Sequence, residues 1–244
     1  MSLLEHCIIP DWPAPANVKA LQSTRYGGVS AAPYDSFNLG GHVGDAPLTV
    51  ARNRMLLNTL LPSEPVWLEQ VHGTAVANAD MAGCRVQADA CIARHRGSVC
   101  VVMTADCLPV LLCDEQGMGV GAAHAGWKGL ATGVIEATVR EMAVEPHKLM
   151  AWLGPAIGPD AFEVGDEVRA AFVAADPSAA AAFVRGQPSK WFADIYSLAR
   201  LRLNALGVTR IYGGDRCTYR EHEQFFSYRR EGVTGRMGSF IWLE

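Results

Sequence analysis

The sequence predicts a mixed α/β protein, because apolar runs of strand length alternate with segments of helical periodicity along the chain. The chain has 244 residues and 50% of them are hydrophobic, which is enough to bury a large core. No change in composition marks a linker between folding units. We therefore expect a single domain over residues 1–244.

Helices are expected where apolar residues recur every three or four positions or where capping residues bracket a segment. The strongest pattern lies in residues 128–142. Asp194 is a suitable N-cap and Gly207 a suitable stop for another helix between them. Residues 49–61 form a further candidate that ends before a proline, and residues 179–182 predict a short helix after a turn.

Strands are expected in short apolar runs that are rich in β-branched residues. Two of these runs, at residues 211–212 and 240–242, carry weaker signals than the others. In chain order, the stronger runs are residues 66–71, 98–103, 110–113, 118–123 and 149–153.

Charge, apolar-run length and cysteine content argue against a nucleic-acid binder, a membrane protein and a disulfide-bonded secreted protein. The formal net charge of −4 does not suggest a nucleic-acid binder. The N-terminus lacks a basic segment followed by a long apolar run, and no stretch reaches the roughly 20 apolar residues that span a bilayer. Seven cysteines without a CxxC pair indicate reduced thiols, with Cys100 and Cys113 in the core. We expect a cytoplasmic protein that binds neither nucleic acid nor membrane.

Three segments place a chemically active side chain at the end of an apolar run. They end at His72, at Asp106-Cys107 and at His124. Strand ends that are distant in sequence can meet at one crevice, and two imidazoles with one thiolate form a known catalytic zinc set that leaves a position for water or substrate. Each residue alone is better explained as a buried core side chain, but their shared position favours a joint metal site.

Two glycine turns carry a cation and are candidates for phosphate. Gly126 and Lys128 precede the strongest helix, whose free N–H groups favour an anion. Arg25 lies in the turn Ser-Thr-Arg-Tyr-Gly-Gly, and arginine suits bidentate phosphate contacts. The alternatives are glycines needed for tight turns and a solvated arginine. Asp106 either orients a ligand and shuttles a proton or caps a turn, and His42 is interpreted as a surface residue.

Several motifs together resemble the YfiH family, also called the laccase-domain or polyphenol-oxidase-like family. The resemblance runs in order from Ile-Pro-Asp-Trp at residues 9–12 to Ser-Phe-Ile-Trp at residues 239–242. The motifs are Ser23-Thr-Arg-Tyr-Gly-Gly28, Asn38-Leu-Gly40, Leu68-Glu-Gln-Val-His-Gly73, Met103-Thr-Ala-Asp-Cys-Leu-Pro109, Ala122-Ala-His-Ala-Gly-Trp127, Trp152-Leu-Gly-Pro-Ala-Ile-Gly-Pro159 and Gly214-Asp-Arg-Cys-Thr218.

The resemblance implies an αββα sandwich that is similar to a cysteine-hydrolase scaffold. It implies a zinc site at His72, Cys107 and His124, with copper as an alternative metal. It also implies phosphorolysis of adenosine, inosine, guanosine and methylthioadenosine, together with adenosine deamination. Among the matched motifs, Arg25, Asn38, Gln70 and Lys128 are the expected substrate-binding residues. Lys128 departs from the arginine of many members, which removes a bidentate phosphate contact.

Other functions use the same residues. A copper-loaded polyphenol oxidase is less favoured, because one site with two histidines and a cysteine cannot reduce oxygen by four electrons. A cysteine hydrolase or amidase that edits peptidoglycan precursors would use Cys107 as nucleophile, His124 as base and His72 to orient it. A binding module with structural zinc would need a fourth protein ligand. We expect a monomer whose partners are a nucleoside and phosphate.

Overall fold

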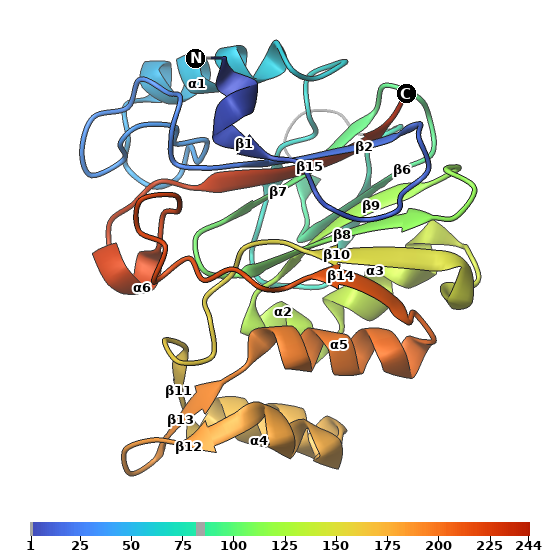
Figure 1. The fold of residues 1–244 in the computed structure, drawn as a ribbon, viewed down its shortest axis with the longest axis vertical. Coiled ribbons are helices and arrows are strands. Elements are labelled where there is room, and N and C mark those ends of the chain that lie inside the picture. The colour runs from blue at the N-terminus through green and yellow to red at the C-terminus, as the bar shows by residue number, and fades with distance from the viewer. Residues whose placement is uncertain (1, 82–85) are drawn as a thin grey trace.

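The computed structural model of the chain describes residues 2–81 and 86–244, and it contains two large packed sheets with helices on both outer sides (Figure 1). In the described part, the first sheet has four antiparallel strands in the order β1–β2–β15–β7. These strands are β1 (Cys7–Ile8), β2 (Val18–Ser23), β7 (Val99–Thr104) and β15 (Met237–Leu243).

The second sheet has six strands among the described residues, in the order β14–β10–β8–β9–β6–β4. The outer pairs β10–β14 and β4–β6 are parallel, and the central pairs are antiparallel. The strands are β4 (Val76–Asn78), β6 (Ala90–Ala93), β8 (Leu108–Asp114), β9 (Val120–Ala125), β10 (Leu149–Leu153) and β14 (Arg210–Gly213).

The central strands are continuous apolar runs because both of their faces are buried. In β7, Cys100 and Val102 face the second sheet, whereas Val99 and Val101 pack on the opposite side with residues of the α1 region. In β8, Leu111 faces the first sheet and its neighbours along the strand pack under the helices. This alternation produces one core between the sheets and one core under each helical layer.

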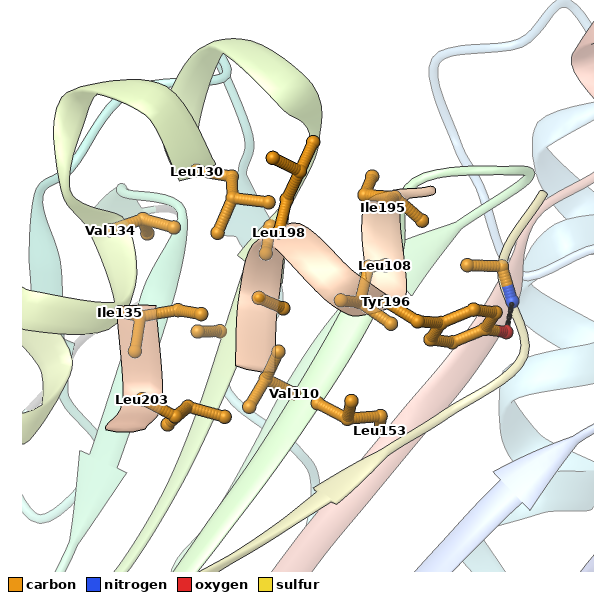
Figure 2. Close-up of a cluster of buried hydrophobic side chains, with 14 of the residues drawn as sticks. Leu108, Val110, Leu130, Val134, Ile135, Leu153, Ile195, Tyr196, Leu198 and Leu203 are labelled. Carbon is orange, nitrogen blue, oxygen red and sulfur yellow. Dashed lines mark hydrogen bonds between the residues drawn. The ribbon is translucent and has the colours of Figure 1, made fainter. Parts of the chain in front are cut away.

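Helices cover both outer sides of this sandwich (Figure 1). The first sheet is covered by α1 (Pro47–Asn58), and the second by α2 (Trp127–Thr132), α3 (Val134–Met142) and α5 (Ile195–Leu206). Figure 2 shows side chains of α5 packed against those of α2, α3 and β8. Tyr196 of α5 also accepts a hydrogen bond at its hydroxyl from the backbone N–H of Ala156, at 2.8 Å.

Smaller elements complete the layers. A three-stranded sheet in the order β11–β13–β12 lies with α4 beyond α5 (Figure 1). The elements are α4 (Asp166–Ala175), α6 (Tyr228–Glu231), β3 (Leu68–Glu69), β5 (Val86–Gln87), β11 (Glu163–Gly165), β12 (Phe183–Arg185), β13 (Lys190–Ala193) and the 3₁₀ helices η1 (Leu3–His6), η2 (Pro146–Lys148) and η3 (Pro177–Ala182). None of the helices in the described ranges is long and apolar enough to cross a membrane. The α/β class and the layered order expected from the resemblance are confirmed.

The helix expected over residues 128–142 is two helices, because Gly133 has a left-handed φ of 103° and separates α2 from α3. The apolar pattern continues across this break, so Leu130, Val134 and Val139 are all buried. The helix expected between Asp194 and Gly207 is confirmed as α5, with the cap and the stop in their expected places. The expected 49–61 helix begins earlier, at Pro47, and ends at Asn58. The short helix at residues 179–182 belongs to η3, which is 3₁₀.

The strand expected over residues 66–71 is wrong in extent, since Leu68–Glu69 pairs as β3 and Val66 forms only an isolated bridge to Cys100. Beyond it, the backbone N–H groups of Val71, His72 and Gly73 donate to the Asp89 carboxylate instead of to a neighbouring strand. The strand expected over residues 149–153 is confirmed as β10, and the other expected strands are present with shifted ends. Cys100 and Cys113 are fully buried free thiols, as expected, and Cys84 lies outside the described residues.

Candidate active site

The structure brings His72, Cys107 and His124 together at one edge of the sandwich. Cys107 lies in the connection between β7 of the first sheet and β8 of the second, and His124 is the penultimate residue of β9. The Cys107 Sγ lies 3.7 Å from His72 Nε2, and the two imidazole rings have centroids 4.7 Å apart. One nitrogen of each histidine and the sulfur all lie within 4.8 Å of one another, so the three atoms can share a metal ion.

Asp89 holds two parts of this trio in place. Its fully buried carboxylate contacts His124 Nδ1 at 2.8 Å through Oδ1. The same carboxylate accepts hydrogen bonds from the backbone N–H groups of residues 71–73, at 2.6 to 3.1 Å. Because Nδ1 is engaged by Asp89, Nε2 is the nitrogen of His124 that is left for a metal or for Cys107. His72 adopts a left-handed φ of 61° within the loop that these bonds fix.

The charges of the site depend on one another. Burial alone raises the pKa of Asp89, but the His124 hydrogen bond and the backbone N–H groups outweigh it and hold that pKa below its usual value. Burial would also raise the pKa of the Cys107 thiol, but His124 and His72 lower it to about 6. Burial alone lowers the pKa of His124, but Cys107 and Asp89 raise it to about 9. The pair therefore favours thiolate and imidazolium near neutral pH.

Gly126 allows the three segments to approach closely. A Cβ atom at this position would lie 2.8 Å from His72 Cδ2 and 3.0 Å from Cys107 Sγ. At Gly129, a Cβ atom would lie 3.0 Å from the backbone oxygen of Gly73. The glycines of this turn therefore serve the packing of α2 against the trio, and α2 itself has only 6 residues.

A cavity of about 320 Å³ opens beside the trio. Gln70 lies in its wall, with its amide fixed by both backbone groups of Met103 at 2.7 and 2.9 Å. The full set of lining residues is His42, Gln70, His72, Met103, Thr104, Ala105, Cys107, His124, Tyr228 and Arg236. A second cavity, lined by Arg54, Trp67 and Glu69 among others, shares His42 and Met103 with the first.

Two of the expected site residues support the cavity wall instead of lining this cavity. Asp106 lies next to Cys107 with a φ of 91°, and its carboxylate accepts hydrogen bonds from the Thr218 hydroxyl and the Arg229 backbone N–H. Asn38 is fully buried, and its Oδ1 accepts from the backbone N–H of Arg236 at 2.9 Å. Both residues position the backbone of a neighbouring segment.

Arg25 and Lys128 do not line the cavity beside the trio. The Arg25 guanidinium forms ion pairs with Glu231 at 3.1 Å and Asp35 at 3.7 Å, and it stacks over the Phe226 ring. Lys128 is exposed on α2, with its ammonium 5.7 Å from the centre of the Trp127 ring. The phosphate role expected for these two residues stays a prediction.

Four residues of the site lie outside the catalytic and substrate-binding residues expected from the sequence. His42 is exposed, as expected of a surface residue, and it also lies in the walls of both cavities, which the sequence did not predict. Tyr228 and Arg236 also line the cavity. Of the four, Asp89 carried the clearest signal, since it is an acid within the apolar run of residues 88–93. Nothing in the local sequence distinguishes Arg236 from a surface arginine.

Comparisons with known proteins support these observations. The chain matches a family model described as multi-copper polyphenol oxidoreductase laccase over residues 19–244. A protein of Escherichia coli K12 named purine nucleoside phosphorylase YfiH is 58% identical over 241 residues, covering 97% of this chain and 98% of that protein. The chain belongs to the YfiH family. A purine nucleoside phosphorylase of Pseudomonas aeruginosa is 54% identical over 238 residues, with 97% and 98% covered.

Solved YfiH-family structures share the fold. The crystal structure of a Neisseria meningitidis protein has a TM-score of 0.94 at 52% identity and covers 98% of this chain and 99% of that chain. YlmD from Geobacillus stearothermophilus has a TM-score of 0.86 at 31% identity, with 95% and 94% covered. The names of the YfiH relatives describe enzymes that act on small molecules. Within residues 2–81 and 86–244, the trio is the one group of His, Cys, Asp and Glu side chains placed to hold a metal.

Proposed function

We propose that this protein is a zinc-dependent purine nucleoside phosphorylase, acting on adenosine, inosine, guanosine and methylthioadenosine, which also deaminates adenosine. The observation that carries the proposal is the convergence of His72, Cys107 and His124 beside a cavity of about 320 Å³ in a chain whose relatives bear the phosphorylase name. We further propose that the chain works as a monomeric single domain over residues 1–244 in the cytoplasm.

The donor atoms of the trio fit zinc. Two imidazole nitrogens and a thiolate are ligands that Zn²⁺ prefers, and three protein ligands are typical of catalytic zinc sites. The low pKa of Cys107 supplies the thiolate that a metal needs, and Asp89 orients His124 as carboxylates orient histidine ligands elsewhere. When bound, zinc would supply Lewis-acid chemistry and make water acidic enough to react near neutral pH.

The cavity residues would position the substrates. In phosphorolysis, a phosphate oxygen forms a bond to C1′ of the ribose while the bond from C1′ to the purine breaks, and the purine nitrogen keeps the electron pair. Gln70 presents an amide already fixed by Met103, and Tyr228 provides an aromatic ring with a hydroxyl at the cavity wall. Such preorganised groups lower the cost of orienting a nucleoside.

Product analysis tests the proposal directly. Metal-quantified protein is incubated with adenosine and with inosine, each with and without phosphate, and the products are identified by mass spectrometry. We expect ribose 1-phosphate and free base only when phosphate is present, and inosine from adenosine in either case. Equal release of free ribose without phosphate would contradict the phosphorylase assignment.

A thiol mechanism is a second candidate, because the three groups Asp89, His124 and Cys107 form a carboxylate–imidazole–thiol series. This series is the arrangement used by cysteine hydrolases, in which the thiolate attacks a carbonyl carbon. It would serve an amidase acting on a peptidoglycan precursor. Chelation separates the two candidates, since an amidase that keeps its full rate after zinc removal uses the thiol.

Copper can occupy the same donor set, because such sites generally bind copper more tightly than zinc. Any polyphenol oxidase activity, as the name of the matched family model suggests, would then depend on the metal loaded. We expect oxidase activity to follow copper content and to be lost in zinc-only protein.

A further inference from the structure

The wall of the cavity contains a guanidinium, that of Arg236, which stacks over the Tyr228 ring at 5.8 Å but forms no ion pair among the described residues. Arg236 lies just before β15, and its guanidinium makes no ion pair with a carboxylate in the described part of the chain. The arginines in comparable half-buried positions differ from it, since Arg25 pairs with Glu231 and Arg202 pairs with Glu136. Partial burial of a charge without a contacting carboxylate is unfavourable, and burial lowers the pKa of Arg236, although the nearby Cys107 and Asp106 act in the opposite direction.

Arg236 is also held in place. Its backbone N–H donates to Asn38 Oδ1 at 2.9 Å, and its carbonyl accepts from the Leu39 N–H at 3.1 Å. Its Nη1 donates to the backbone oxygens of Thr234 and Gly235 at 3.1 and 3.0 Å. These contacts use one nitrogen of the guanidinium, so the other donors are available to a bidentate acceptor.

Two further residues line the same cavity. The Thr104 hydroxyl is buried and has no hydrogen-bond partner in the described residues. His42 carries a second nitrogen donor, and its pKa is lowered by burial and by the nearby charges of Arg236, Arg54 and His124. The cavity wall thus combines a fixed guanidinium and an imidazole with Thr104, whose buried hydroxyl is unsatisfied among the described residues.

We propose that Arg236, together with His42 and Thr104, forms a binding subsite for inorganic phosphate beside the His72–Cys107–His124 trio. This proposal rests on the proposed phosphorolysis, which needs a phosphate oxygen placed next to the ribose. The guanidinium fork matches two phosphate oxygens, and a phosphate dianion would form the ion pair that no carboxylate of the described residues makes with Arg236. Arg25, whose charge already has partners, and the exposed Lys128 are less suited to the role.

The test is phosphate binding by zinc-loaded, full-length protein. Isothermal titration with inorganic phosphate gives the dissociation constant, and inosine phosphorolysis gives the KM for each substrate. We expect Arg236→Gln to raise the phosphate dissociation constant and phosphate KM roughly tenfold or more, as loss of a charge-assisted pair implies. The KM for inosine should change by less than about threefold. Arg140→Gln, which removes an exposed arginine on α3, is the matched control.

Arg236→Lys keeps the charge but not the fork, and we expect an intermediate loss. Should the glutamine variant fail to fold, the lysine variant and His42→Gln decide, and unchanged phosphate binding in both would overturn the subsite. Another role for Arg236 is to balance the Cys107 thiolate. That role predicts slower alkylation of Cys107 in Arg236→Gln with unaltered phosphate binding, which would also overturn the proposal.

The outcomes separate the subsite from the reaction. If the wild-type protein binds phosphate through Arg236 but cleaves no nucleoside with it, the proposed reaction fails and the anion subsite stands. If cleavage requires phosphate but the Arg236 variants bind phosphate as the wild type does, the subsite fails and the reaction stands.

Discussion

Asp89→Asn tests whether one carboxylate positions the residues that we propose to bind the metal. Each Asp89 oxygen accepts two hydrogen bonds: Oδ1 from the His72 backbone N–H and His124 Nδ1, and Oδ2 from the backbone N–H groups of Val71 and Gly73. An asparagine must place its NH₂ group where one of these oxygens was. Whichever oxygen position the NH₂ group takes, the two N–H donors that were bound there then face a donor and lose their hydrogen bonds.

The magnitude follows from those bonds. A hydrogen bond to a charged group contributes about 1.5–3 kcal/mol. Losing two of them lowers the unfolding free energy by roughly 3–6 kcal/mol, less whatever the amide oxygen recovers. Metal affinity should fall about 10- to 100-fold, the usual effect of removing a carboxylate that orients a histidine ligand.

The assay compares urea unfolding and zinc competition against a chromogenic chelator for two variants. Asp114→Asn is the matched control, because the Asp114 carboxylate is also buried and accepts backbone N–H groups of Gln116, Met118 and Gly119. It should destabilise the fold to a similar extent and leave zinc affinity unchanged. Wild-type zinc affinity in Asp89→Asn, or an equal loss in Asp114→Asn, would refute the positioning role.

Three further predictions concern the trio. Cys107→Ala should abolish zinc binding and nucleoside turnover together, measured by metal analysis and product formation; turnover without zinc would contradict the metal mechanism. In metal-free protein, the Cys107 pKa of about 6 means that the thiolate predominates above that pH. The rate of iodoacetamide labelling should therefore be half-maximal near pH 6, whereas an ordinary cysteine reaches this point near a pH of about 8.5. A midpoint above about pH 8 would contradict the low pKa. Gly126→Ala introduces a Cβ 2.8 Å from His72 Cδ2, so zinc affinity should fall at least tenfold while far-ultraviolet circular dichroism stays native; unchanged affinity would show that the loop relaxes freely.

Much of the fold could be predicted because local patterns matched their final environment. The helix between Asp194 and Gly207 has a cap and a stop that act over a few residues, so it was placed correctly. The break at Gly133 was missed because the apolar positions keep their spacing across it. The strand expected at residues 66–71 failed because Asp89, far along the chain, takes the backbone N–H groups that a strand would use.

The site was predictable only in part for the same reason. His72, Cys107 and His124 follow apolar runs and are chemically distinctive, so their convergence was foreseeable. Of the cavity wall beyond the trio, only Gln70 was expected, since Arg236 and His42 are brought there by segments whose sequences resemble ordinary turns. Asp106 had two interpretations from the sequence, a chemical role and a capping role; its carboxylate accepts hydrogen bonds from Thr218 and Arg229, and the chemical role stays a prediction.

The trio takes its members from both layers of the sandwich. Cys107 lies where the chain crosses from one sheet to the other, and the loop carrying His72 is fastened to the first sheet through Gln70 and Met103 and to the second through Asp89. The distances among the two imidazole nitrogens and the Cys107 sulfur therefore depend on how the two sheets are aligned. A bound ion would resist any sliding of one sheet over the other, so metal loading and the mechanical rigidity of the whole sandwich should rise and fall together.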